Sequence, residues 1–256
     1  MDISIFFPSR PLKQTVAKCN PTINTRGAPL SKGSACSTNG KRYEAHIQNM
    51  CTQLKYKNNT PLCVSRETAG SSKNPDLVIQ TDQGQQVFME IKRGMVPDWG
   101  QSRLQKLEGT YVTASEIHNN ILQSWQSHNK LYDGRDLPFL DKHLFYEDWC
   151  RMKQSFKDVY IDCSEHEISN FYRTKQVSYI QVYGKGLFHT GEDPCGFGVP
   201  YFSPKQRSRI RIKVHTKGDD THPCKLSCTM SLQVMDLETS PWSLDEIAPP
   251  CLISRV

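Results

Sequence analysis

Two short stretches of strand-like residues, 74–80 and 86–94, dominate the pattern of hydrophobic and polar positions. The connection between them contains Asp82 and Gly84, residue types that favour a tight turn, so the pattern predicts a β-hairpin. Pro75 fits this prediction because it lies at the start of the first strand, where its missing N–H group is tolerated.

Three charged residues lie at the ends of this predicted hairpin. Asp76 opens the first strand, whereas Glu90 and Lys92 end the second strand two residues apart and therefore on one face. Desolvating ionised groups is costly unless they are paired or bind a metal, so a sheet that only has to pack would not favour them. These three residues are therefore candidates for mutual pairing or metal binding. The alternative is a solvated hairpin with a Glu/Lys edge.

The rest of the pattern predicts an α-helical middle and a β-rich end of the chain. Apolar residues at helical spacing, a capping signal and a short polar, basic run predict helices at about 39–54, 101–107, 113–125, 139–156 and 168–172. Alternating residues and short apolar runs predict strands at 159–161, 177–183, 209–215 and 226–234. These elements indicate an α/β (α+β) fold with a mixed central sheet flanked by helices and a C-terminal β-hairpin region.

Basic residues concentrate near the last predicted hairpin. Residues 199–217 contain six Lys or Arg and no acid, and Arg209, Arg211 and Lys213 alternate with apolar residues. One face of this strand is therefore expected to be basic and the other apolar. Such a face can be merely solvated, but the absence of acids and the dimensions of a two-stranded ribbon favour contact with DNA phosphates.

The composition favours a soluble globular protein. The chain has 256 residues, of which 37% are apolar and 23% charged, with a net charge of +6. Its ten cysteines lack regular spacing, and no apolar run suits a membrane span or a signal peptide. We therefore expect reduced thiols and a cytoplasmic protein, or one in the nucleus or host-cell interior if the source is viral, and not a secreted protein.

Residues 1–39 are expected to form a basic N-terminal arm. This segment is rich in Pro, Ser, Asn and Thr and carries five Lys or Arg against one acid, Asp2. Within it, Ile3-Ser4-Ile5-Phe6-Phe7 resembles the tail of a sliding-clamp-binding peptide, although the glutamine that precedes such tails is missing. The favoured interpretation is an arm that Phe6 and Phe7 attach to the protein's own core. Binding to a sliding clamp is the alternative.

The spacing of the hairpin charges resembles a known signature. Pro75-Asp76, thirteen intervening residues and Glu90-Ile91-Lys92 resemble the PD-(D/E)XK motif of the restriction-endonuclease-like nucleases. The resemblance implies that Asp76, Glu90 and the main chain of Ile91 bind a divalent cation, and that Lys92 positions or polarises the attacking water. Carboxylate oxygens suit Mg²⁺, with Mn²⁺ as a substitute, and such a metal makes hydroxide available near neutral pH.

The resemblance also assigns roles to residues on the two predicted helices that flank the hairpin. Family members often carry a glutamate on the preceding helix in a context like Gly40-Lys41-Arg42-Tyr43-Glu44, which implies that Glu44 faces the metal through water. The alternative is a surface glutamate paired with Lys41 or Lys55. The predicted helix at 101–107 is expected to support the site with a polar or basic residue.

The connection at 66–73, between the first predicted helix and the hairpin, is a second candidate DNA contact. Its small and basic residues suit a close approach to a phosphodiester backbone. The candidates are Arg66, Ser71, Ser72 and Lys73. The alternative is a plain surface connection.

These observations predict a Mg²⁺-dependent endodeoxyribonuclease that acts on double-stranded DNA and is most like a type II restriction endonuclease. Two alternatives stay open, a structure-specific repair or recombination nuclease of the same fold and a non-catalytic DNA-binding module. We expect residues 40–256 to form a single nuclease domain, and a homodimer is left open. Its expected parts are a catalytic core at about 40–110, a helical segment at about 111–175 and a β-rich part at 176–256.

Overall fold

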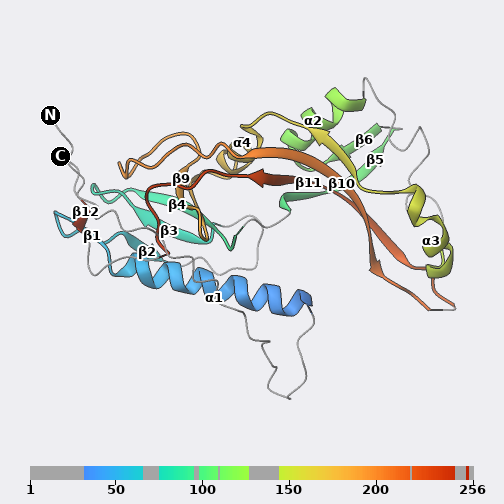
Figure 1. Cartoon of the computed structure of the whole chain (residues 1–256), viewed down its shortest axis with the longest axis horizontal. Helices are drawn as coiled ribbons and strands as arrows, with labels where there is room; N and C mark the ends of the chain where they lie inside the picture. Colours follow the sequence, from blue (N-terminus) through green and yellow to red (C-terminus); the bar gives the residue numbers. More distant parts are fainter. Residues whose placement is uncertain are drawn as a thin grey trace, which may run out of the picture.

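The computed structural model describes residues 32–65, 75–94, 98–108, 110–126, 144–219, 221–245 and 252–253. Within these residues the chain forms four α-helices, one 3₁₀ helix, two five-stranded sheets and a two-stranded sheet (Figure 1). The predicted α+β class is therefore confirmed. None of the helices in this part of the chain combines the length and the apolar character that crossing a membrane requires.

The first five-stranded sheet contains the predicted hairpin. Its order is β2-β3-β4-β8-β9, and all neighbours are antiparallel except β4 and β8, which are parallel. The strands are β2 (Cys63–Ser65), β3 (Leu77–Gln80), β4 (Gln86–Lys92), β8 (Val177–Val182) and β9 (Gly186–His189). The expected mixed sheet is thus present, and its parallel pair joins segments that are far apart in the sequence.

The long helix α1 (Lys32–Thr52) packs on this sheet and fixes the hairpin from one side (Figure 1). Its Ile47 and Cys51 are fully buried in one apolar cluster with Leu77 and Met89 of the hairpin. Burying such side chains contributes roughly 1.5–3 kcal/mol each, so this cluster holds the ends of the two strands in register.

The helix α1 begins earlier than the sequence pattern predicts. Its first residue is Lys32, whereas the predicted start is Asn39, so the expected N-terminal arm overlaps the helix. The residues between these two positions are mostly small and polar. They show no apolar periodicity from which a helix start could be predicted.

The second five-stranded sheet is wholly antiparallel and has the order β6-β5-β11-β10-β7. The predicted C-terminal hairpin, β10–β11, forms its centre with two strands of 12 residues. The strands are β5 (Trp99–Leu107), β6 (Thr110–Thr113), β7 (Val159–Asp162), β10 (Lys205–Thr216) and β11 (Lys225–Asp236). A small parallel pair, β1 (Lys55–Tyr56) and β12 (Leu252–Ile253), completes the described strands.

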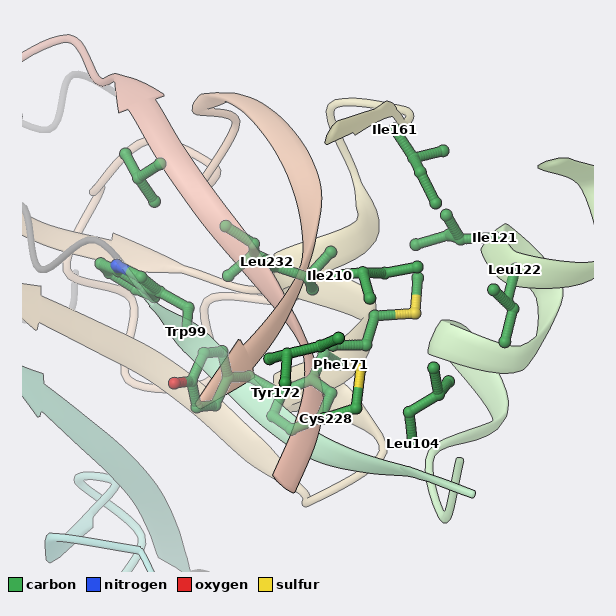
Figure 2. Packing of buried hydrophobic residues seen from close by; sticks show 14 of the residues in the cluster. Trp99, Leu104, Ile121, Leu122, Ile161, Phe171, Tyr172, Ile210, Cys228 and Leu232 are labelled. Carbon is green, nitrogen blue, oxygen red and sulfur yellow. The ribbon is translucent and has the colours of Figure 1, made fainter. Parts of the chain in front are cut away.

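Helices cover one face of the second sheet and form the larger core (Figure 2). They are α2 (Glu116–Gln126), α3 (Tyr146–Met152) and α4 (Glu167–Arg173). Trp99, Ile210 and Leu232 of the sheet share this cluster with Leu122 of α2 and Phe171 of α4. The core therefore lies between the sheet and its helices.

The helix predicted at 101–107 is wrong, because this segment is the strand β5. Leu104 is buried whereas Gln101, Arg103 and Gln105 are exposed, which is the two-residue alternation of a half-buried strand. Gly100 has a φ of 55°, a conformation that suits glycine and interrupts any helix at this point.

The helix predicted at 139–156 is shorter than expected. The structure has α3 from Tyr146 and a 3₁₀ helix at Lys153–Ser155, and residues 139–143 lie outside the described part of the chain. Trp149 is buried in the core, whereas Met152 is 38% exposed and does not face it.

Candidate active site

The hairpin β3–β4 brings the two candidate carboxylates together. Leu77 pairs with Met89, and continuing this register by one residue places Asp76 opposite Glu90. The backbone N–H of Asp76 donates to the Met89 carbonyl at 3.2 Å, and Oδ2 of Asp76 accepts from the Ile91 N–H at 2.7 Å. The side chain of Asp76 is therefore fixed against the strand that carries Glu90.

Lys92 completes this cluster. Its ammonium donates to Oε1 of Glu90 and lies 5.6 Å from the centre of the Tyr172 ring. Burial opposes the charge of Lys92, but Tyr172, Glu90 and Asp76 outweigh it and raise the pKa of Lys92 above its ordinary value. Lys92 therefore stays protonated at neutral pH and acts as a hydrogen-bond donor, not as a base.

Asp76 is a carboxylate whose surroundings disfavour its charge. Burial, together with the negative charge of Glu90, raises the pKa of Asp76 to about 7, although Lys92 and the Ile91 N–H favour the ionised form. Asp76 and Glu90 are thus two half-buried carboxylates close together, and a further cation at this position would relieve their repulsion.

Lys175 is a member of this site that the sequence pattern did not indicate. It follows α4, and its ammonium lies 4.6 Å from the centre of the Phe171 ring. Burial lowers the pKa of Lys175, although Glu90 and Asp76 favour its charged form. The parallel pairing of β4 with β8 brings the end of α4 to the hairpin, and this pairing leaves no local signal in the sequence.

A scan against protein-family models, a search of curated proteins and a search of solved structures each found no match. The chemistry of the site therefore has to be argued from its own residues.

The donor set suits a hard divalent cation. Within the described residues no three His, Cys, Asp or Glu side chains gather as a metal-binding group. Mg²⁺, however, keeps several waters and is often held by one or two carboxylates and its substrate's phosphates. Asp76 and Glu90 meet that smaller requirement, whereas the role of Ile91 as a main-chain ligand stays a prediction.

Glu44 lies on α1 near the hairpin, as the resemblance implies. Its charge is the smallest of the named contributions that raise the pKa of Asp76, so Glu44 is a more distant neighbour than Glu90. Its side chain is half-buried. This position fits an outer role, in which Glu44 acts on a cation through water instead of direct contact.

We predict that Glu44→Gln raises the Mg²⁺ concentration needed for half-maximal DNA cleavage by about 10-fold, with a smaller effect at saturating Mg²⁺. A metal titration of the cleavage rate measures this change, and Glu116→Gln, an exposed residue on α2, is the control. If the Mg²⁺ concentration for half-maximal cleavage is unchanged in Glu44→Gln, Glu44 is a surface residue with no role in metal binding.

The predicted basic strand is only partly available to a ligand. Arg209 is 5% exposed and its guanidinium binds Asp98 and, at 3.5 Å, Asp158, so burial and these ion pairs disfavour its expected contact with DNA, which stays a prediction. The acids come from the segments that precede β5 and β7, which the acid-free sequence of β10 could not indicate. Arg211 and Lys213 are partly exposed.

The other predicted contacts lie outside the described residues. These are Arg66, Ser71, Ser72 and Lys73 of the connection before the hairpin, together with residues 3–7 of the N-terminal arm.

Proposed function

We propose that the protein is a Mg²⁺-dependent endodeoxyribonuclease that hydrolyses phosphodiester bonds of double-stranded DNA. One observation carries the proposal: Asp76 and Glu90 face each other across the hairpin, and Lys92 is hydrogen-bonded beside them. The PD-(D/E)XK resemblance, the mixed sheet and the position of Glu44 on the preceding helix support the same assignment. The finer proposal is a type II restriction endonuclease.

Each residue of the cluster has a separate task in this proposal. Asp76 and Glu90 would hold the cation, which when bound lowers the pKa of a coordinated water and offsets charge on the phosphate. Lys92 is protonated, so it donates a hydrogen bond that orients the attacking water or a phosphate oxygen. Burial of Lys92 against Tyr172 limits its motion and keeps this donor in place.

Lys175 is proposed to contact the phosphate being cut. It is partly exposed and lies in the electrostatic field of the two carboxylates, and it is the second ammonium of the site. A cation at this position would stabilise the negative charge that develops on the phosphate oxygens.

We predict that Lys175→Gln lowers the single-turnover cleavage rate at saturating DNA by roughly 100-fold. Lys153→Gln, an exposed lysine next to α3, is the matched control and should cut at the wild-type rate. Equal cleavage rates for the two variants would show that Lys175 does not contribute to the active site.

Incubation of the purified protein with plasmid DNA and Mg²⁺, followed by sequencing of the cut ends, tests the proposal. Discrete fragments with a common end sequence support a restriction endonuclease. Unspecific or branch-selective cutting supports the structure-specific nuclease instead. Intact plasmid with a gel shift would leave a DNA-binding module and refute the nuclease.

A further inference from the structure

The face of the second sheet that points away from its helices is polar across three strands. On β10, Ile210 and Ile212 enter the core, so Arg211 and Lys213 project from the opposite face. On the two neighbouring strands, the side chains that project from this face carry hydroxyl, amide or guanidinium groups. These are Ser227 and Thr229 on β11, and Arg103 and Gln105 on β5. All of them are exposed or half-exposed.

The strand register places the cations of this face in adjacent rows. Arg103 pairs with Thr229, and Thr229 pairs with Arg211, so the three side chains form one row across β5, β11 and β10. The next row contains Lys213, which pairs with Ser227. Because neighbouring strands lie about 4.8 Å apart, the two arginines of the first row are separated by about 10 Å. In the described part of the chain, no ion pair neutralises Arg103 or Lys213.

A partly exposed ion network holds Arg211 in position. Nε of Arg211 donates to both carboxylate oxygens of Asp158, at 2.9 and 2.8 Å. Asp158 is also within 3.5 Å of Arg209, which in turn binds Asp98, and Asp98 accepts from Oγ of Ser231 at 2.8 Å. Arg211 is thus anchored along one edge of its guanidinium, and its Nη1 atom makes no hydrogen bond within the described residues. An anchored guanidinium loses less conformational freedom when it binds a phosphate.

We infer that the outer face of β5, β11 and β10 is the surface on which duplex DNA docks, with Arg103, Arg211 and Lys213 as its phosphate contacts and Asp158 as the positioning residue of Arg211. The inference rests on the proposed function, which supplies the substrate. Charge complementarity supports it, because the two rows contain three cations, and the two acids of the adjoining ion network, Asp158 and Asp98, are paired with Arg211 and Arg209.

A short stretch of chain joins the docking face to the candidate active site. Asp98, on the outer face, follows Lys92 by six residues, so their Cα atoms are at most about 20 Å apart. At 3.4 Å per base pair this distance corresponds to roughly six base pairs. Under this inference, one duplex extends from the docking face to the acid cluster.

The test is a binding measurement in EDTA, where metal-dependent cutting cannot occur. Fluorescence anisotropy with a 5′-labelled duplex of about 30 base pairs is recorded over a salt series for wild type, Arg103→Gln, Arg211→Gln and Lys213→Gln. Each variant should lose about 5- to 10-fold in affinity for all sequences, and the slope of log K against log salt should fall by roughly one. Lys153→Gln, on the helical side of the sheet, should bind like wild type.

Asp158→Asn gives the sharpest outcome. If Asp158 acted only through its charge, its removal would strengthen DNA binding. The positioning role predicts weaker binding and a smaller salt slope, because Arg211 is then free to leave the phosphate. Circular dichroism verifies that Asp158→Asn is folded. If it is not, the DNA affinities of Arg103→Gln and Lys213→Gln still decide whether this face binds DNA.

The results separate this inference from the proposed nuclease. Wild-type affinity and salt slope in the Arg103, Arg211 and Lys213 variants would overturn the docking face even if the protein cuts DNA. Tighter binding to an RNA duplex than to a DNA duplex would overturn it as well. Loss of binding in these variants would support the face even if no cleavage is found.

Discussion

Asp76→Asn and Glu90→Gln should each reduce DNA cleavage by at least about 1,000-fold, because each removes one of two carboxylates that would hold the cation. Lys92→Met should reduce cleavage by a similar factor, since it removes the donor that orients the water or phosphate. DNA affinity should be unchanged or higher for Asp76→Asn and Glu90→Gln, because both changes remove negative charge near a polyanion. Single-turnover cleavage of plasmid DNA in saturating Mg²⁺ measures the rates.

Glu116→Gln on α2 is the control for these variants, because it removes an exposed carboxylate remote from the hairpin. It should cut like wild type. Near wild-type cleavage by Asp76→Asn or by Glu90→Gln would contradict the placement of the site, provided that circular dichroism shows a folded protein in each case.

His118→Leu should make the protein more stable in mild acid by roughly 3 kcal/mol relative to wild type. His118 of α2 is 0% exposed, and neither ring nitrogen has a hydrogen-bond partner within the described residues. Burial lowers the pKa of His118 from 6.5 to about 4, and its ring packs edge-on against Phe171 at 5.8 Å. The folded protein therefore holds a neutral imidazole that must gain a proton when the chain unfolds in acid.

The direction of this effect follows from the lowered pKa. The folded state binds fewer protons than the unfolded state between pH 6.5 and about 4, so the free energy of unfolding falls as the pH falls through this window. Urea unfolding at pH 7.5 and pH 4.5 measures it. The exposed His215→Gln is the control and should follow wild type. If the free energy of unfolding of His118→Leu depends on pH as that of wild type does, another group causes the acid sensitivity.

The hairpin and the paired acids can be predicted from the sequence because their signals are local. The turn at Asp82 and Gly84, the strand period and the charges at the strand ends all lie within 20 residues, 75–94. The C-terminal hairpin β10–β11 is predictable for the same reason, since Arg209 to His215 alternates strictly with period two.

Other features depend on pairing between distant segments and therefore escape local reasoning. Lys175 lies in the electrostatic field of the acids because β8 is parallel to β4 and brings the end of α4 to the hairpin. Arg209 is neutralised by Asp98 from the segment before β5 and by Asp158 from the segment before β7. The strand β5 was predicted as a helix because its polar residues admit both periods, and only its neighbours β11 and β6 decide between them.

The most direct test of the central claim is the metal dependence of cleavage by the wild-type protein. Protein stripped of metal with EDTA and dialysed is mixed with DNA that contains a random-sequence library, and the cut ends are counted as Mg²⁺ is added. The account predicts no cutting without metal, new ends that rise to saturation with Mg²⁺, and their loss when EDTA is returned. Equal cutting with and without Mg²⁺, or no new ends at any Mg²⁺ or Mn²⁺ concentration, would contradict it.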